Sequence, residues 1–272
     1  MNKITTGITI LLFLQILHSS NVLCHNIVSR LKEITIYNDS PSFDKKGFAG
    51  PNIKQNGEFK IIKNIVKPGD IIFDIGANIG DWSKAIFSVS PNTFIYAFEP
   101  IPSAFDSLLS NILTNKQNFF AYNIAFSNTI GKKEFCLCKN ASRLSGFYNR
   151  KHFQERNYII KKIIVKTDTL DAFCTKHYID HIDFIKIDTE GEELKILQGA
   201  PHLLTNKAIS IIQFEYGGTY KDAKTTLKEV YTLLSSYNYK VFRIAPFGLI
   251  KISKWRNALE NYQYSNFLAI RS

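Results

Sequence analysis

Apolar positions along the chain follow two alternating patterns from about residue 57 onward. Short runs of β-branched and aromatic residues, typical of buried strands, alternate with segments in which apolar residues recur every three or four positions, as on one face of a helix. The pattern predicts helices over residues 57–66, 82–89, 101–113, 170–177, 192–204 and 221–236. It predicts strands over residues 71–75, 93–98, 119–124, 182–187, 208–214, 239–244 and 265–270. Strands that alternate with helices favour an α/β fold, in which helices cover both faces of a parallel sheet.

The alternation of strands and helices is interrupted between about residues 127 and 166. Segments 132–138 and 158–166 alternate apolar and polar residues, which is typical of a hairpin with one exposed face. We therefore expect an insertion in the main domain rather than a separate domain. The predicted organisation is a hydrophobic segment over residues 1–24, an N-terminal lead with a helix over residues 25–67, and a main domain over residues 68–272.

The N-terminal segment has the layout of a secretory signal or a short membrane anchor. Lys3 precedes an apolar stretch over residues 8–17, and polar residues 18–21 follow it. The stretch is shorter than the roughly 20 residues that a spanning helix needs. Export, membrane association through residues 4–23 and packing as an amphipathic helix therefore stay open.

Composition and charge exclude few classes of function. The chain has 272 residues, of which 45% are hydrophobic, enough for one well-packed core or at most two small domains. The 34 basic and 23 acidic residues leave a net charge of +11, which suits nucleic acid, anionic lipid or a phosphate-bearing ligand. A general lysine bias accounts for this charge equally well. The four cysteines are too few and too unevenly spaced for a disulfide framework.

The most informative segment is a strand, a glycine-containing turn and the start of a helix over residues 71–82. Gly76 allows a sharp turn and the close approach of a ligand, and the following helix offers unpaired backbone amides. The next strand ends at Glu99, about 20 residues on, where a carboxylate accepts hydrogen bonds from the ribose of an adenosine cofactor. Glu99 could instead start the next helix. Because the three-glycine fingerprint for a pyrophosphate is absent, S-adenosylmethionine fits the turn better than NAD.

A second group of polar residues follows the strand predicted over residues 182–187. Asp188 stands at its C-terminal end, the ligand-binding edge of an open α/β sheet, and Glu190 lies in the tight turn after it. Glu192 and Glu193 fall in the first turn of the next helix, where acidic residues complement the helix dipole. The dipole does not explain Asp188 or Glu190, so both are candidate functional residues.

These motifs resemble the FkbM-type S-adenosylmethionine-dependent methyltransferases. The resemblance rests on FDIGANIGDWS at 73–83, AFEP at 97–100, NIAFS at 123–127, the Thr-Leu-Asp turn at 169–171 and DFIKIDTEGEELKILQGA at 183–200. It implies the class I methyltransferase fold, a Rossmann-like α/β sheet of seven mostly parallel strands with helices on both faces and an antiparallel last strand. It also implies O-methylation of hydroxyl groups on sugars, polyketides and related metabolites, with S-adenosylmethionine as methyl donor.

The resemblance also assigns residues to the predicted cofactor site. The turn after the first strand would bind the methionine end of the cofactor, through Asp74, Gly76, Ala77, Asn78 and Gly80. Glu99 would bind the ribose. Asn123 and Ala125 match the family's third motif, near the adenine.

The chemistry of methyl transfer indicates which other residues to examine. The protein must mainly align the acceptor with the methyl group and exclude water. An alcohol acceptor also loses a proton, which a carboxylate at the C-terminal edge of the sheet can take. Asp188 or Glu190 is the candidate general base, and Glu215, after the next strand, is a third acid. Lys186 is a candidate for orienting the acceptor. Because that next strand ends Glu-Tyr rather than Asp-Asn, no metal site is predicted.

The predicted acceptor is a small molecule or glycan with a free hydroxyl group, and two other function classes stay open. The charge of +11, with Phe147 and Tyr148 close to Arg150, suggests a nucleic-acid methyltransferase, but the Asn/Asp-Pro-Pro-aromatic motif of amino-methylating enzymes is absent. A catalytically silent, membrane-tethered binding module is the other class. Because S-adenosylmethionine is supplied in the cytosol, we expect a cytosolic catalytic domain tethered by the N-terminal segment; secretion after signal cleavage is the alternative.

Overall fold

The computed structural model of the chain describes residues 30–44, 47–48, 50, 52–112, 117–150 and 157–272. The chain divides into two compact units, Met1–Glu33 and Ile34–Ser272. Within the described ranges, no helix is long and apolar enough to cross a membrane. The hydrophobic segment over residues 1–24 lies outside the described residues, so its role as a signal or tether stays a prediction.

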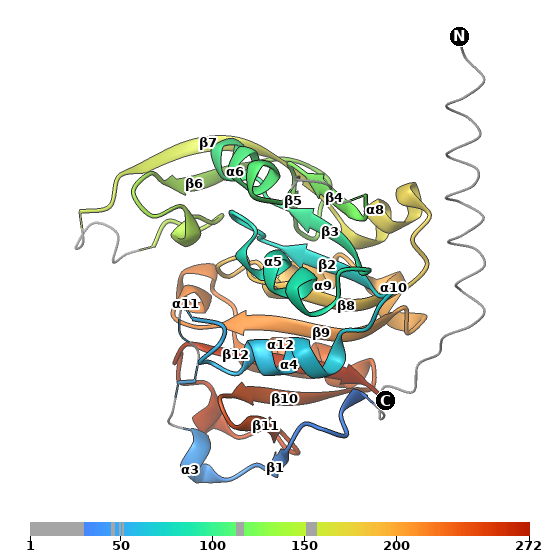
Figure 1. Cartoon of the computed structure of the whole chain (residues 1–272). Helices are drawn as coiled ribbons and strands as arrows, with labels where there is room; N and C mark the ends of the chain where they lie inside the picture. The colour runs from blue at the N-terminus through green and yellow to red at the C-terminus, as the bar shows by residue number, and fades with distance from the viewer. Residues whose placement is uncertain (1–29, 45–46, 49, 51, 113–116, 151–156) are drawn as a thin grey trace. The chain divides into compact units, whose positions relative to one another are not determined.

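A nine-stranded sheet runs through the larger unit (Figure 1). The strands lie in the order β1 (Ile36–Asn38), β11 (Gly248–Lys251), β10 (Tyr239–Ala245), β12 (Ser265–Arg271), β9 (Ile209–Tyr216), β8 (Ile182–Ile187), β2 (Ile71–Ile75), β3 (Phe94–Phe98) and β4 (Phe119–Tyr122). From β9 to β4 all neighbours are parallel, whereas β12 is antiparallel to both β9 and β10. The mostly parallel sheet with an antiparallel last strand is therefore confirmed.

Two strands extend the sheet beyond the predicted seven. β11 pairs antiparallel with β10, and β1 pairs parallel with β11. They contain four and three residues, too few for an alternation of apolar and polar positions to be recognised. The lead around β1 is fixed by Arg256, whose guanidinium group lies 2.5 Å from Asp39 and 2.7 Å from Asp44.

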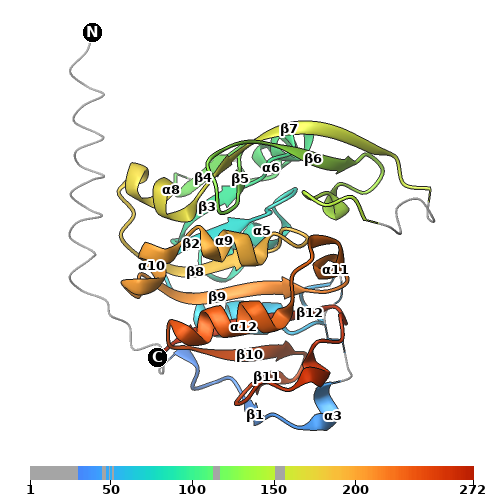
Figure 2. The ribbon, with the colours of Figure 1, turned by 180° about the vertical axis from the view of Figure 1, so that it is seen from behind.

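Helices cover both faces of the sheet, as predicted (Figures 1 and 2). One face carries α4 (Glu58–Ile65), α5 (Asp81–Val89) and α6 (Pro102–Ile112). The other carries α8 (Leu170–His177), α9 (Glu193–Gln198), α10 (Pro201–Thr205) and α12 (Leu227–Ser236). Short helices α3 (Pro41–Asp44) and α11 (Thr219–Ala223) precede α4 and α12 in the chain, and single 3-10 turns span Ser142–Leu144 and Asn257–Leu259.

Two helices that the pattern predicts as continuous are each divided. The segment over residues 192–204 divides at Gly199, where a Cβ would lie 2.4 Å from the carbonyl oxygen of Ser127, and Pro201 begins α10. The segment over residues 221–236 divides before Thr226, which forms a capping box with Glu229 at the start of α12. The Thr-x-x-Glu spacing of a capping box can be recognised in the sequence and marks the start of α12.

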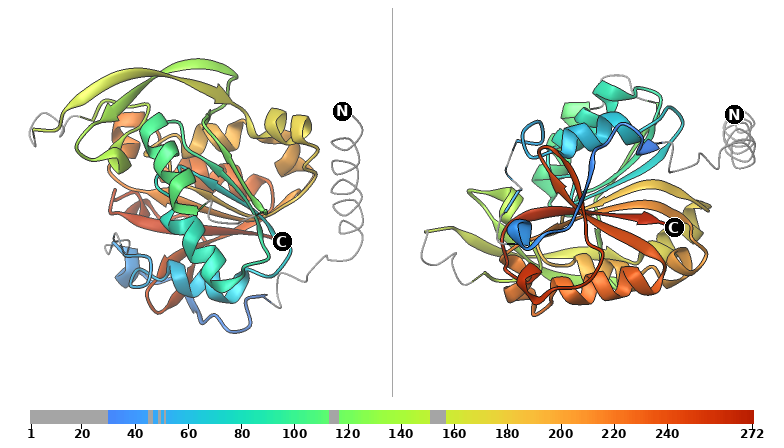
Figure 3. Two further views of the ribbon diagram at one scale, coloured as in Figure 1. Left: turned by 45° about the horizontal axis from the view of Figure 1, so that its top comes forward. Right: turned by 90° about the horizontal axis from the view of Figure 1, so that it is seen from below.

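The predicted insertion supplies two of the three strands of a second sheet, which lies beyond the β4 end of the large sheet (Figures 1 and 3). β6 (Gly131–Cys138) and β7 (Ile160–Asp168) form an antiparallel hairpin, and β5 (Ala125–Phe126) pairs parallel with β7. Phe135 and Val165 pack with Ile101 and Ala104 at the start of α6. This packing holds the hairpin beside the carboxyl ends of the central strands.

Candidate active site

The glycine-containing turn connects β2 to α5 and lies against the end of β8. Gly76 has a φ of 82°, and a Cβ on Gly76 would lie 1.9 Å from the backbone carbonyl oxygen of Asp188. Glycine is therefore required because two turns of the chain touch at this point. The missing Cβ therefore makes room for the neighbouring turn, and the close approach of a ligand to Gly76 stays a prediction.

The backbone amides of the same turn bind other parts of the chain. The N–H groups of Gly76 and Ala77 both donate to the carbonyl oxygen of Phe98, at 3.0 Å each. The N–H group of Asn78 donates to Oε2 of Glu99, at 2.9 Å. These three amides therefore fix the turn to the end of β3, whereas the unpaired amides that the sequence predicts belong to the start of the following helix, α5.

Glu99 connects the end of β3 to the start of α6. Its Oε1 accepts a 2.8 Å hydrogen bond from the N–H group of Ile101, which is the contact expected of a residue that starts a helix. The side chain is 3% exposed, and this burial raises the pKa of Glu99 to about 7 against the opposing effect of the two backbone hydrogen bonds. The carboxylate also lines a cavity, so the structural contact and the predicted ribose contact are compatible.

This cavity has a volume of about 110 Å³ and lies at the carboxyl ends of β2, β3 and β8. Of the predicted site residues, it is lined by Gly76, Asn78, Glu99, Ala125, Asp188 and Glu190. Apolar side chains from β5, from the start of α6 and from the inserted hairpin complete it, among them Ile101, Phe126, Phe135 and Phe147.

Four predicted cofactor residues do not line the cavity. Asp74 is fully buried behind the turn, where its Oδ2 accepts a 2.7 Å hydrogen bond from Ser83 and burial raises its pKa. Gly80 packs under α6, and Asn123 donates to the carbonyl oxygen of Glu99 at 2.8 Å. Ala77 lines an adjoining cleft instead. Asp74, Gly80 and Asn123 thus support the cavity from outside.

The adjoining cleft is larger, about 1410 Å³, and charged side chains, among them Lys186 and Glu215, are part of its lining. It shares Gly76, Asn78, Asp188 and Glu190 with the cavity, so these residues stand at the junction of the two spaces. Glu215 and Lys186 line the cleft only. The structure therefore brings all three candidate acids to one edge of the sheet, and two of them to the junction.

The turn after β8 is held in an uncommon backbone conformation. Glu190 has a φ of 60°, in the left-handed region that non-glycine residues seldom adopt. The carboxylate of Glu193 stabilises the turn, since it accepts hydrogen bonds from the N–H groups of Thr189 and Gly191 at 2.9 and 3.0 Å. Burial raises the pKa of Glu193 to about 8. Glu193 thus orients the acidic turn, a role beyond the helix-dipole effect that the sequence suggests.

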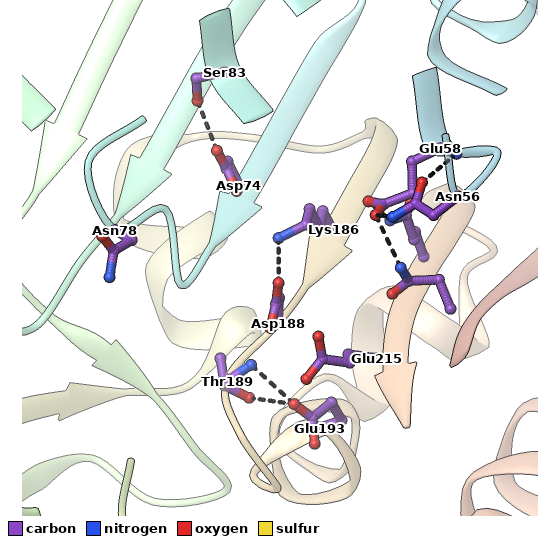
Figure 4. A network of polar contacts seen from close by, with 12 residues as sticks. Asn56, Glu58, Asp74, Asn78, Ser83, Lys186, Asp188, Thr189, Glu193 and Glu215 are labelled. Carbon is purple, nitrogen blue, oxygen red and sulfur yellow. Dashed lines mark hydrogen bonds and ion pairs between the residues drawn. The ribbon is translucent and has the colours of Figure 1, made fainter. Parts of the chain in front are cut away.

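Each of the three candidate acids has a charged or hydrogen-bonding partner among the described residues (Figure 4 shows two of these acids and Lys186). Asp188 Oδ2 lies 2.7 Å from Lys186 Nζ, and Glu190 lies 2.6 Å from Arg150. Glu215 accepts a short hydrogen bond from the Tyr264 hydroxyl. The side chain of Asp188 is 30% exposed, whereas that of Glu190 is 14% exposed and Glu215 is 5% exposed.

Burial changes the protonation of two of these acids. It raises the pKa of Glu190 to about 7, although Arg150 opposes the change. It raises the pKa of Glu215 well above its usual value, and the nearby carboxylates of Asp188 and Glu190 act in the same direction. Two carboxylates of the site therefore hold protons readily near neutral pH.

Glu192 joins the inserted hairpin to the acidic turn. Its carboxylate accepts hydrogen bonds from the hydroxyl groups of Ser127 and Tyr148, at 2.6 and 2.5 Å, and Lys133 lies 3.7 Å away. Tyr148 and Arg150, which the sequence suggested as a nucleic-acid surface, thus contact the acidic turn. The charge of Arg150 is evident from the sequence, but its partner, Glu190, depends on the fold.

The residues around the cavity suit an adenosine-containing methyl donor. The carboxylate of Glu99 provides acceptor oxygens for ribose hydroxyls, and Ile101, Phe126 and Phe147 provide apolar walls for a purine. Among the residues that the structure describes, no three His, Cys, Asp or Glu side chains are grouped so that they could hold a metal ion.

Comparison with known proteins identifies the family. Residues 74–241 match the model of the methyltransferase FkbM domain, which covers more than half of the chain. The chain is 23% identical over 201 residues to the 2-O-methyltransferase NoeI of Sinorhizobium fredii, covering 71% of this chain and 82% of NoeI. It is 27% identical over 176 residues to the hexuronic acid methyltransferase AglP of Haloferax volcanii, covering 64% of this chain and 69% of AglP.

A third relative matches over a shorter part. The 31-O-demethyl-FK506 methyltransferase FkbM of Streptomyces tacrolimicus is 31% identical over 130 residues, which is 48% of this chain and 47% of that relative. The family model spans both the glycine-containing turn and the acidic turn. The chain therefore belongs to the FkbM methyltransferase family and takes its methyl group from S-adenosylmethionine, as the motifs predict.

Proposed function

We propose that this methyltransferase transfers the methyl group to a hydroxyl group of a sugar or a sugar-containing small molecule. The observation that carries the proposal is the position of Asp188 and Glu190, which line both the cavity and the cleft. An acceptor in the cleft then meets the methyl donor beside two carboxylates. The names of NoeI and AglP specify O-methylation at a 2-position and methylation of a hexuronic acid, which supports a sugar-like acceptor.

The residues of the cavity have distinct roles in this proposal. When bound, S-adenosylmethionine supplies an electrophilic methyl group on a sulfonium centre. Glu99 accepts hydrogen bonds from the ribose, and the apolar walls exclude water. The turn at Gly76, tied to Phe98 and Glu99 by three amides, is already ordered for binding, so little conformational entropy is lost there.

Asp188 is the general base in this proposal. It has the most exposed side chain of the three acids, and Lys186 occupies only its Oδ2. Glu190 is engaged by Arg150 and Glu215 by Tyr264. A carboxylate within hydrogen-bond reach of an acceptor hydroxyl takes its proton as the oxygen attacks the methyl group. Glu190 and Glu215 are then placed to orient other hydroxyl groups of a polyol.

Methyl transfer to a panel of defined sugars tests the function. The full-length chain is incubated with S-adenosylmethionine labelled in its methyl group and with methyl glycosides of neutral hexoses, 6-deoxyhexoses and hexuronic acids. We expect label on at least one glycoside in a bond that survives alkali, because an ether is stable where a methyl ester is hydrolysed. Label that alkali releases would indicate a carboxyl acceptor, and no label on any glycoside would contradict a sugar-like acceptor.

The affinity for S-adenosylhomocysteine is expected to rise between about pH 6 and pH 8. The pKa of Glu99 is raised to about 7, and only its ionised form accepts hydrogen bonds from both ribose hydroxyls. Ionisation strengthens binding, so affinity is lost as the pH falls through that value. Glu99→Gln should weaken binding at least about tenfold at pH 8, or about 1.4 kcal/mol, and should remove this pH dependence.

Isothermal titration calorimetry at several pH values measures both effects. Glu134→Gln provides a matched control, because Glu134 lies on the exposed side of β6 and pairs with Lys162. Equal affinity of the wild-type chain at pH 6 and pH 8 would argue against a ribose contact through Glu99.

A further inference from the structure

An exposed tyrosine lines the large cleft beside one of the candidate acids. Tyr264 is 43% exposed and lines the cleft together with Glu215. It directly precedes β12, whose first residue, Ser265, pairs with Tyr216 of β9. This pairing places Tyr264 at the carboxyl end of β9, where Glu215 lies. Tyr264 is outside residues 74–241 that match the family model, so the family motifs assign no role to it.

The hydroxyl group and the ring of Tyr264 are held by different neighbours. The hydroxyl group donates a short hydrogen bond to Oε1 of Glu215, which is 5% exposed. The backbone of Gly217 packs against the ring, since a Cβ on Gly217 would lie 3.3 Å from Cδ2 of Tyr264. Because a buried carboxylate binds the hydroxyl group, the surface that Tyr264 presents to the cleft is mainly that of the ring.

The segment before Tyr264 is fixed by hydrogen bonds to the main domain. The N–H group of Tyr262 donates to the hydroxyl oxygen of Tyr216 at 2.7 Å, and this hydroxyl group donates to Glu260 at 3.0 Å. The carboxylate of Glu260 also accepts from the first two N–H groups of α12, at 3.1 Å each. The ring of Tyr264 is therefore ordered in advance, and a ligand that binds to it loses little conformational entropy.

The cleft has a second aromatic side chain, which is less accessible. Among the described residues, Trp82 and Tyr264 are the aromatic residues that line the cleft. Trp82 is 5% exposed, and the ammonium group of Lys186 lies 5.9 Å from the centre of its ring. Tyr264 thus provides the aromatic surface that an acceptor in the cleft can reach.

A pyranose ring has the chemistry that matches this surface. Its hydroxyl groups point outward around its edge, whereas its C–H groups gather on its faces. The face of an aromatic ring carries partial negative charge and attracts such C–H groups. The hydroxyl groups of a bound sugar still need hydrogen-bond partners, and Lys186, Asp188 and Glu215 line the same cleft. An aromatic surface beside charged side chains favours a cyclic sugar over a purely apolar acceptor.

We propose that Tyr264 binds the acceptor by stacking its ring on one face of a pyranose, and so selects cyclic sugars over open-chain polyols. The inference rests on the proposed function and deepens it, because it names a residue that recognises the acceptor. Tyr264 takes no proton in this proposal. The stacked sugar keeps its hydroxyl groups directed to the charged side chains of the cleft, where Asp188 takes the proton of one of them.

Glycoside binding by two variants of the same residue tests the stacking contact. Affinities of the full-length chain for the panel of methyl glycosides are measured by saturation-transfer NMR with S-adenosylhomocysteine present. Tyr264→Leu should weaken binding of the best glycoside roughly tenfold, whereas Tyr264→Phe should stay within about threefold of the wild type. Both variants lose the hydroxyl group that binds Glu215, so their difference reports on the ring alone.

Two controls accompany these variants. Tyr178→Leu removes a tyrosine ring that is 73% exposed at the end of α8, away from the residues that line the cavity and the cleft, and should leave glycoside affinity unchanged. Sorbitol, an open-chain polyol, offers hydroxyl groups without a ring face. It should bind the wild-type chain more weakly than the best glycoside, and Tyr264→Leu should not weaken its binding further.

Selective protonation measures the same contact in the wild-type chain. A chain deuterated except at its tyrosine rings is saturated at the aromatic signals in heavy water. Because Tyr264 is the one tyrosine among the described residues that line the cleft, saturation should pass to the C–H protons of the bound glycoside. A chain protonated only at its phenylalanine rings is the control, since the described lining of the cleft contains no phenylalanine.

The outcomes separate the inference from the proposed function. Equal glycoside affinities of Tyr264→Leu and Tyr264→Phe, or a wild-type chain that binds none of the glycosides, overturn the inference. If Tyr264→Leu does not fold, the selectively protonated chain decides, and an absence of saturation transfer from the tyrosine rings overturns it. A chain that binds a glycoside through Tyr264 but transfers no methyl group to it contradicts the proposed function and supports the stacking contact.

Discussion

Asp188→Asn is expected to lower methyl transfer at least about a hundredfold, while the affinity for S-adenosylhomocysteine stays within about threefold. Asparagine keeps the size and one oxygen of the side chain but does not take a proton at neutral pH. Asp188 lines both the cavity and the cleft and is the most exposed of the three candidate acids. Turnover with a labelled methyl donor and an accepting glycoside, beside calorimetry of the same preparations, measures the two quantities.

Asp183→Asn is the matched control for this experiment. Asp183 lies near the amino end of the same strand, β8, where its Oδ2 accepts a 3.0 Å hydrogen bond from the N–H group of Ile71. The substitution removes the same charge far from the junction, and turnover should be unchanged. If Asp188→Asn is fully active, Asp188 is not the general base, and Glu190 or Glu215 is the candidate instead. The variants Glu190→Gln and Glu215→Gln would then show which of the two takes the proton.

Gly76→Ala is expected to reduce the free energy of unfolding by about 2–5 kcal/mol and to weaken S-adenosylhomocysteine binding at least about tenfold. A left-handed backbone conformation disfavours alanine, and its Cβ would lie 1.9 Å from the carbonyl oxygen of Asp188. The turns after β2 and β8 must then separate. Both turns line the cavity, so stability and cofactor affinity should fall together, as measured by denaturant unfolding and calorimetry.

The same substitution at Gly218 provides the comparison. Gly218 has a φ of −59°, and a Cβ there would meet no atom within 4 Å. Gly218→Ala should therefore leave the free energy of unfolding unchanged or raise it slightly, because alanine reduces the entropy of the unfolded chain. A loss of stability equal to that of Gly76→Ala would show that the contact between the two turns is not the cause.

Local sequence patterns predicted most of the fold. Runs such as residues 71–75 and 182–187 are rich in β-branched and aromatic residues because both faces of a central parallel strand are buried. The predicted order of strands and helices, the sheet and its antiparallel last strand follow from these runs and from the family resemblance. The sequence does not predict β1 and β11, because three or four residues are too few to show an alternation of apolar and polar positions.

The site was predicted in part. Short motifs keep their residues together in space, so the turns at Gly76 and Asp188 were both located from the sequence. The structure adds physical reasons that the sequence does not show: Gly76 makes room for Asp188, and Glu193 stabilises the acidic turn through backbone hydrogen bonds. A motif thus indicates that a residue matters, whereas its partner depends on a contact that the motif does not contain.

The class of fold, the family and the functional edge of the sheet can all be predicted from the amino-acid sequence. Each of these depends on the burial of single segments or on residues close together in the chain. Which charged side chains meet depends on the packing of the folded chain. Glu58 and Gln213 are 155 positions apart in the chain and bind each other at 2.6 Å, and Arg150 reaches Glu190 from the inserted segment. Such pairings depend on how whole helices and strands pack, because a buried charge is stable only where packing supplies its partner.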